Sequence, residues 1–280
     1  MTIRIATWNV NSVKPRLRQL LEWLKADAPD VVLLQEIKCV DEAFPAMEIE
    51  ELGYNIAVHG QKTYNGVAIL SKYPLEDVSK GLAGDENDLQ ARYIEAVVSI
   101  NGKCQISNGN KPSVDLCPLS FDILRVASVY VPNGQTADSE KFPYKLAFLE
   151  RLYAHLKQLL TYNEMLVVGG DYNIAPTDDD VHDPALWRGS VLTHDEVRKQ
   201  FRRLQNLGLH DAYRLLHPNA HEYSWWDYRS NGFVRDNGLR IDHLLLSAQS
   251  VDKLSGCVIE RNMRGVEKAS DHTPVVVEFT

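Results

Sequence analysis

Residues 3–11 read IRIATWNVN, an apolar alternation that ends in two amide side chains. The alternation predicts a strand that delivers these amides at its C-terminal end. Leucines at helical spacing then predict a helix from Ser12 to Ala28, where Pro29 stops it. The run DVVLLQE at 30–36 is apolar without a break and predicts a buried strand that ends in a carboxylate. A strand, a helix and a buried strand in immediate succession indicate an α/β chain.

The rest of the chain continues to mix strands with helices. Segments rich in β-branched or aromatic residues predict strands at Tyr54–His59, Gly66–Leu70, Ile94–Ile100, Ile123–Val131, Met165–Gly169, Ile241–Ser247, Cys257–Glu260 and Val275–Phe279. Apolar residues at helical spacing predict helices at Phe44–Leu52, Tyr144–Leu160 and Asp195–Leu207. Asn101–Ser120 is irregular and is interpreted as a long surface excursion. No repeat or flexible linker divides the sequence, so we expect residues 1–280 to form a single domain.

The composition limits the function classes. The chain has 280 residues, 44% hydrophobic and 24% charged, which is typical of a globular protein. Its formal net charge of −8 argues against binding nucleic acid through bulk positive charge, although a local basic face stays open. An acidic excess also arises where carboxylates gather to bind cations. The four cysteines form no C-x-x-C pair, and the sequence has no signal-peptide pattern and no membrane-length apolar run. We therefore expect reduced thiols, a cytoplasmic location and no membrane association.

Polar side chains at the ends of apolar strands are the pattern that bears on function. They are Asn9, Glu36, Asp171, Asn173, Asp271 and His272. Each alone is more often a turn or cap residue, but several in one chain favour a site. Glu36 and Asp271 are hard oxygen donors of the kind that Mg²⁺ takes, and the lack of H-x-x-x-H or C-x-x-C argues against zinc. These residues make a divalent-cation site a specific hypothesis.

Two of these segments have the residues for acid–base chemistry. The turn after Gly169-Gly170 exposes Asp171 and Asn173 on the same side, which suits a general base beside an amide that orients water. Standing alone, the segment would be interpreted as a plain Gly-Asp turn. His272 needs an acceptor to fix its tautomer or stabilise its charge, and Asp242 or Asp271 could supply one.

The segment YSWWDYR at 223–229 gathers aromatic residues at spacings that suit an exposed strand or loop. Aromatic faces stack unpaired bases or sugars, and Arg229 and Arg240 could contact phosphate. Because some of these rings must also fill a core, we expect one of Trp225 and Trp226 to face outward.

The polar loop 60–66 has donors suited to a phosphate backbone, among them Lys62 and Asn65, although its composition also fits a plain solvated turn. A second polar region, 187–203, could supply the local basic face through Arg188, Arg198, Lys199, Arg202 and Arg203. The alternative for these five side chains is a solvated helix surface.

Taken together, segments along nearly the whole chain resemble the exonuclease III family of apurinic/apyrimidinic (AP) endonucleases, within the endonuclease/exonuclease/phosphatase fold shared with DNase I. They are TWNVN at 7–11, LQEIK at 34–38, GQK at 60–62, NGVA at 65–68, YVPNG at 130–134, GDYNIAP at 170–176, SWWDYR at 224–229, GLRID at 238–242 and SDHTP at 270–274. The resemblance implies a four-layered α/β sandwich, in which two mixed β-sheets pack face to face between helices and the site lies at one edge of the sheets.

The resemblance also implies roles at that edge. Glu36 and Asp271, with Asn9 nearby, would bind Mg²⁺, with Mn²⁺ as the alternative. Asp171 would be the base that activates water, and Asn173 would orient that water.

Further roles concern the phosphate. His272, held by Asp242, and the hydroxyl of Tyr130 would contact the scissile phosphate. Whether there are one or two ions stays open, because Asp171, Asn173 and His272 could hold a second.

The function that this resemblance implies is that of a Mg²⁺-dependent DNA-repair phosphodiesterase. It would incise double-stranded DNA 5′ to abasic sites, remove nucleotides and blocking groups from 3′ ends, or do both, as a monomer. Trp225, Leu239 and Ile241 would form the apolar pocket for a flipped-out sugar. The region 187–203 departs from the family, and a bulky side chain there could restrict the enzyme to strand ends.

Three alternatives are kept. The first is an end-specific 3′-5′ exonuclease or 3′-phosphatase with little activity at internal abasic sites. The second is a phosphoinositide phosphatase of the same fold, against which the aromatic segment and the lack of an interfacial apolar helix argue. The third is a DNA-binding module that has lost catalysis, although every position that the chemistry needs is filled.

Overall fold

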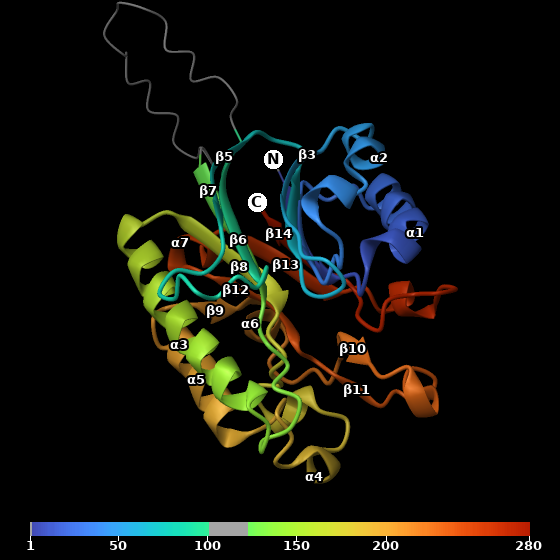
Figure 1. The fold of residues 1–280 in the computed structure, drawn as a ribbon, viewed down its shortest axis with the longest axis vertical. Helices are drawn as coiled ribbons and strands as arrows, with labels where there is room; N and C mark the ends of the chain where they lie inside the picture. The colour runs from blue at the N-terminus through green and yellow to red at the C-terminus, as the bar shows by residue number, and fades with distance from the viewer. Residues whose placement is uncertain (1, 101–122) are drawn as a thin grey trace, which may run out of the picture.

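The computed structural model describes residues 2–100 and 123–280 and has four layers (Figure 1). In spatial order, the first six-stranded sheet contains β13 (Leu254–Ile259), β14 (Val275–Phe279), β1 (Ile3–Asn9), β2 (Val31–Gln35), β4 (Val67–Ser71) and β3 (Asn55–His59). The second contains β5 (Leu75–Lys80), β6 (Tyr93–Ser99), β7 (Ile123–Tyr130), β8 (Met165–Asp171), β12 (Asp242–Leu246) and β9 (His210–Asp211). A separate ribbon pairs β10 (Trp225–Trp226) with β11 (Gly238–Leu239).

Helices cover the outer faces of both sheets. The α-helices are α1 (Val13–Ala26), α2 (Ala46–Glu50), α3 (Lys141–Leu159), α4 (Pro184–Trp187), α5 (Asp195–Gln205), α6 (Ala212–Leu216) and α7 (Ala248–Val251). Short 3₁₀ helices lie at Asp41–Ala43, Leu160–Tyr162, Asp178–Asp180, Arg229–Asn231 and Arg261–Gly265. In Figure 1, α1 and α2 flank the first sheet, and α3 and α5 flank the second. The prediction of a four-layered α/β sandwich with two mixed sheets is therefore confirmed.

Strand β1 is buried on both faces, which explains its sequence. Ile3 and Ile5 lie in the core between the two sheets, whereas Ala6 and Trp8 lie in the core beneath α1. The ring of Trp8 meets Trp23 of α1 edge-on, with 5.4 Å between the ring centroids. A strand between two apolar layers needs apolar residues at successive positions, so the apolar runs of β1 and β2 reflect their central place.

Gly169 in β8 lets the two sheets approach closely. A Cβ atom at this position would lie 2.6 Å from Leu33 of the first sheet and 2.7 Å from Leu244 of β12. Asp171 follows two residues later, so its side chain points from the same face of β8 toward the first sheet.

Strand directions gather several chain ends at one edge of the sandwich. β1 and β2 run parallel, as do β7 and β8, so all four have their C-terminal ends there. The antiparallel strand β12 begins at the same edge, where Asp242 pairs with Asp171. β14 runs antiparallel to β1, which brings the residues that precede it to this edge as well.

The expected elements occur within a few residues of their predicted bounds. β5 escaped prediction because it is an edge strand with mostly exposed polar side chains. The helix predicted at Phe44–Leu52 is shorter, because only Ala46–Glu50 is α-helical. The excursion predicted at Asn101–Ser120 lies outside the described residues. Within residues 2–100 and 123–280, no helix is long and apolar enough to span a membrane.

Candidate active site

Three side chains from both sheets converge at the shared edge. Asn9 ends β1, Glu36 follows β2 and Asp171 ends β8. The amide Nδ2 of Asn9 donates to Glu36 Oε1 at 2.9 Å and to Asp171 Oδ2 at 3.0 Å. Glu36 adopts a left-handed backbone conformation with φ 51°, which is uncommon for this residue type. Such strain concentrates at functional sites.

His272 completes this cluster from the segment before β14. Its Nδ1 lies 2.8 Å from Asp242 Oδ2, and its Nε2 lies 3.7 Å from Asp171 Oδ2. Asp242 also accepts a hydrogen bond from Ser224 Oγ at 2.6 Å. Burial disfavours the charged ring, but the charges of Asp242 and Asp171 outweigh it and raise the pKa of His272 to about 10. The partner of His272 is therefore Asp242, whose carboxylate favours the protonated form of the ring.

The side chain of Asp171 has a pKa close to neutral pH. Burial, together with the charges of Asp242 and Glu36, raises the pKa of Asp171 to about 7, against the opposing charge of His272. The backbone N–H of Asn173 donates to Asp171 Oδ1 at 2.8 Å and favours the ionised form. A pKa near the working pH is what general base catalysis requires.

Asn173 is held from several directions. It adopts φ 51°, a conformation that asparagine tolerates better than most residues. Its Nδ2 donates to the carbonyl of Val131 at 3.0 Å and lies 3.2 Å from Asp171 Oδ2. Its Oδ1 accepts from Asn133 Nδ2 at 2.9 Å. Asn173 thus connects the segments that follow β7 and β8.

Asp271 lies beside this cluster rather than in it. Its carboxylate accepts from Asn11 Nδ2 at 2.8 Å and from Trp225 Nε1 at 3.0 Å. The ammonium of Lys38 lies between Asn11 and Glu36, 2.6 Å from Asn11 Oδ1 and 2.8 Å from Glu36 Oε2. A positive charge is therefore already favoured between Glu36 and the Asn11–Asp271 pair.

The donor chemistry fits a hard divalent cation. Ligand atoms of Glu36, Asp171 and His272 all lie within 4.8 Å of one another. The two carboxylates repel each other in a buried setting, which a cation would relieve. The carboxylates of Glu36 and Asp171 supply the oxygen donors of this group, and the ring of His272 presents Nε2 to it while Nδ1 is hydrogen-bonded to Asp242.

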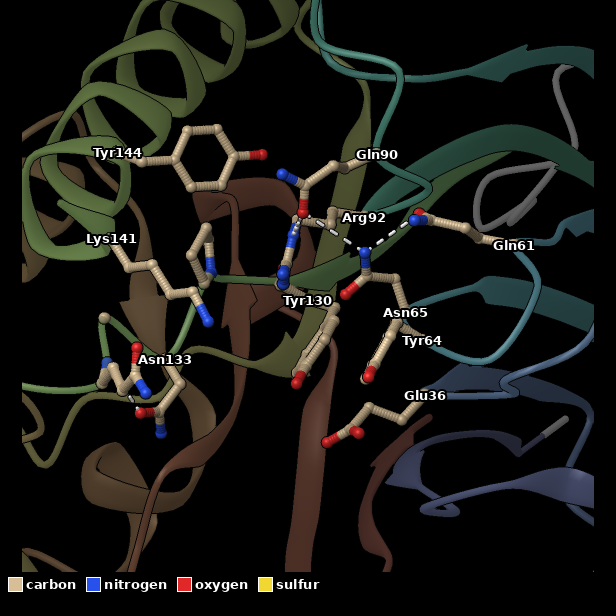
Figure 2. Close-up of a pocket in the computed structure, with 13 residues that line it drawn as sticks. Glu36, Gln61, Tyr64, Asn65, Gln90, Arg92, Tyr130, Asn133, Lys141 and Tyr144 are labelled. Atoms are coloured by element: carbon tan, nitrogen blue, oxygen red, sulfur yellow. Dashed lines mark hydrogen bonds between the residues drawn. The ribbon is translucent and has the colours of Figure 1, made fainter. Parts of the chain in front are cut away.

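A cavity of about 430 Å³ opens beside this cluster (Figure 2). Its wall includes Glu36, Tyr130, Asn65, Arg92, Asn133 and Lys141. In Figure 2, the Glu36 carboxylate and the Tyr130 hydroxyl point into the same open space. The guanidinium of Arg92 lies over the ring of Tyr130, 4.7 Å from its centroid. Burial, with the charges of Glu36 and Asp171, raises the pKa of Tyr130 well above its ordinary value, so the hydroxyl stays a donor.

Two residues predicted to contact DNA lie on the loop before β4 and differ in exposure. Lys62 is exposed, whereas Asn65 is buried, and its Nδ2 donates to Gln61 Oε1 at 2.9 Å and Gln90 Oε1 at 3.2 Å. Asn65 therefore shapes the cavity wall.

The aromatic segment turns one tryptophan outward. Trp226 is fully buried, whereas Trp225 is half-buried beside the site. Leu239 and Ile241 belong to the core against which Trp225 packs. Trp187 of α4 meets Trp225 edge-on at 6.1 Å. Trp187, the first residue of the region 187–203, therefore lies next to Trp225.

The prediction that Arg240 contacts phosphate is wrong, because its side chain is buried in ion pairs. Its side chain is 1% exposed and binds two buried carboxylates, Asp180 Oδ1 at 2.8 Å and Asp211 Oδ2 at 2.8 Å. Three of the five basic residues of region 187–203 also form ion pairs within the protein: Arg198 pairs with Asp178, Lys199 with Glu196 and Arg203 with Glu150.

The sequence reasoning missed Lys145, which is fully buried in α3. Its Nζ donates to the carbonyls of Asn133 at 3.1 Å, Asn173 at 2.7 Å and Val191 at 2.9 Å. Burial lowers the pKa of Lys145 to about 7, despite the nearby charge of Asp171. The signal was its spacing, because Lys145 shares the apolar face of α3 with the buried residues Leu149, Leu152 and Leu156.

Comparison with known proteins gives a consistent assignment. Residues 6–272 match the Endonuclease/Exonuclease/phosphatase family. The chain is 34% identical over 285 residues to exodeoxyribonuclease III of Haemophilus influenzae, with 99% of this chain and 100% of that protein covered. It is similar to the solved 3′ phosphatase NExo from Neisseria bound to a product DNA hairpin, with TM-score 0.90, 37% identity and 99% of each chain covered. It is also similar to an AP endonuclease from Archaeoglobus fulgidus, with TM-score 0.87, 35% identity and 99% of each chain covered. The chain therefore belongs to the endonuclease/exonuclease/phosphatase family, and it is a nuclease of the exonuclease III type.

Proposed function

We propose that this nuclease is a Mg²⁺-dependent DNA-repair phosphodiesterase that incises double-stranded DNA 5′ to abasic sites and removes nucleotides or blocking groups from 3′ ends. The observation that carries the proposal is the pairing of Asp171, whose pKa is raised to about 7, with the imidazolium of His272 at 3.7 Å. A base near neutrality beside a fixed cation is suited to the attack of water on a phosphate anion.

The chain's own residues divide the work in this proposal. Asp171 accepts the proton of the attacking water, and Asn173 holds that carboxylate through its backbone N–H at 2.8 Å. His272, kept charged by Asp242, and the neutral hydroxyl of Tyr130 donate to the phosphate oxygens. These donors stabilise the negative charge that builds up in the transition state.

A divalent ion would be held by the carboxylate of Glu36, next to the side chain of Asn9. Asp271 is connected to Asn9 through Asn11, which donates its backbone N–H to Asn9 and its side-chain amide to Asp271. When bound, Mg²⁺ neutralises charge on the phosphate and on the departing 3′ oxygen. Mn²⁺ would suit the same oxygen donors.

The test is cleavage of three end-labelled duplexes by the purified protein with Mg²⁺, each repeated with EDTA. The first duplex contains a central abasic-site analogue, the second is intact, and the third has a recessed 3′-phosphate. We expect incision at the central site and processing of the 3′ ends, both lost in EDTA. No cleavage of any substrate would overturn the proposal and direct attention to phosphoinositides.

A second candidate is an end-specific 3′-5′ exonuclease or 3′-phosphatase. It is favoured by Trp187, which packs against Trp225 where a flipped-out sugar would lie, with the exposed Arg188 next to it. The Neisseria relative, described as a 3′ phosphatase, agrees with this candidate. Processing of 3′ ends without central incision in the same assay would select it. We also propose that this protein is cytoplasmic and monomeric.

A further inference from the structure

Lys145 lies where three separate segments meet. Its Nζ donates to the carbonyl of Asn133 after β7, of Asn173 after β8 and of Val191 between α4 and α5. In its protonated form the side chain has three N–H groups, which match these three acceptors one to one, so the three hydrogen bonds favour the charged form against the effect of burial. The side chain is 0% exposed, so water does not replace any of these hydrogen bonds.

The burial of this lysine is difficult to explain by the packing of α3 alone. The same face of the helix already places Leu149, Leu152 and Leu156 in the core. An apolar residue at position 145 would fill that face without the desolvation cost of a buried cation. The hydrogen bonds to the three segments therefore account for a lysine at this position.

The three segments have a functional relation to one another. Asn133 donates its side-chain amide to Asn173, and the backbone N–H of Asn173 donates to Asp171. The third segment follows Trp187, which packs against Trp225 at the edge of the site. One ammonium thus ties the segment carrying the base to the segment that borders the substrate side.

The packing around Gly134 shows how closely the first segment approaches the lysine. Gly134 has φ 93°, and a Cβ atom there would lie 3.2 Å from Lys145 Cδ and 3.5 Å from Val191. An added methyl group would therefore crowd the lysine stem and touch Val191 at an ordinary contact distance, and the positive φ would strain an alanine there as well.

We propose that Lys145 is a positioning residue that holds the segments of Asn133, Asn173 and Val191 in register, so that Asp171 faces the scissile phosphate while Trp187 stays against Trp225. The proposal rests on the proposed function for its catalytic consequence. Its structural consequence, the clamping of three segments, is independent of any substrate.

The experiment compares Lys145→Met with Leu156→Ala, a core truncation in the same helix that contacts none of the three segments through a hydrogen bond. Both variants are measured well below their unfolding temperatures. Lys145→Met keeps a long side chain but removes the donors. We expect its kcat on the 3′-phosphate duplex to fall roughly 100-fold with little change in KM, because small misplacements of catalytic groups have effects of that size. Leu156→Ala should lower stability while its kcat stays near that of the wild type.

Amide hydrogen exchange supplies a readout without substrate. In Lys145→Met, exchange should rise selectively in segments 131–135, 173–176 and 189–193, whereas Leu156→Ala should raise exchange along α3. If Lys145→Met does not fold, Gly134→Ala serves as the second variant and should raise exchange in the same segments.

The outcomes separate the two proposals. Selective exchange with a kcat defect supports the positioning role. A kcat equal to that of Leu156→Ala, or exchange that rises uniformly, overturns it. If the wild type cleaves no substrate, the proposed function fails, and the exchange pattern alone still decides whether Lys145 clamps the segments.

Discussion

Replacing Arg240 with methionine separates a buried structural cation from a DNA-binding one. Arg240 is 1% exposed and binds Asp180 and Asp211, which are 0% and 5% exposed. Methionine fills a similar volume but removes the cation that the two buried carboxylates share, which leaves Asp180 with Arg214 and Asp211 with His243. Breaking a buried pair by removing one partner costs about 3–5 kcal/mol. At roughly 2–4 °C per kcal/mol for a chain of this size class, Tm should fall by roughly 6–20 °C.

The assay pairs thermal and urea unfolding with DNA affinity over a series of salt concentrations. A lost phosphate contact would reduce the slope of log K against log salt by about one. For Arg240→Met we expect an unchanged salt slope of DNA binding, together with the fall in Tm of roughly 6–20 °C. The matched control is Arg188→Met at an exposed position, which should leave Tm unchanged. A stable Arg240→Met protein with a reduced salt slope would refute the reasoning.

The same ion network predicts how stability depends on pH. Burial alone would raise the pKa of Asp180 and of Asp211, but the charge of Arg240 outweighs it and lowers both. As pH falls below about 4, the unfolded chain binds protons before the folded protein does, so stability declines. The stabilisation is fully present above that range. Arg240→Met should flatten this acid dependence, and an unchanged profile would contradict the assignment.

Further predictions concern the site and the interface between the sheets. Asp171→Asn should lower kcat roughly 10²–10⁴-fold, the usual effect of removing a general base, while DNA affinity is retained; retained cleavage would exclude Asp171 as the base. The pKa of His272 is raised to about 10, so Asp242→Asn should move the alkaline limb of kcat/KM against pH to lower pH, because the ring then loses its proton sooner; an unmoved limb would show that Asp242 does not keep His272 charged. Gly169→Ala should destabilise the fold by about 1–3 kcal/mol in urea unfolding, because its Cβ would lie 2.6 Å from Leu33; an unchanged midpoint would show that the sheets can separate at no cost.

Most of the longer strands and helices could be predicted from local sequence patterns. Apolar runs and leucine spacing predicted β1, β2 and α1, because a strand or helix between apolar layers must present apolar side chains at its own period. β5 was missed because an exposed edge strand has no such requirement. β9 and β11 were missed as well, since two residues per strand are too few for a period to show.

The sequence predicted which kinds of side chain form the site, but it predicted less well which of them form hydrogen bonds with one another. Polar residues at strand ends marked Asn9, Glu36 and Asp171, because parallel strands end at a common edge. The residues alone left the partner of His272 open between Asp242 and Asp271, whereas the family resemblance implied Asp242. The structure pairs it with Asp242 at 2.8 Å, while Asp271 binds the indole of Trp225.

The amino-acid sequence by itself determined the longer buried strands, the longer helices and the kinds of side chain at their ends, since each depends on neighbours within a few residues. Only the tertiary structure decided that Arg240 lies between two buried carboxylates and that Lys145 binds three backbone carbonyls. These contacts join residues far apart in the chain. They depend on strand order, register and the distance between layers, which no local period encodes. A cation in the sequence is compatible with solvent, phosphate or a buried carboxylate, and burial in the folded protein is what selects among them.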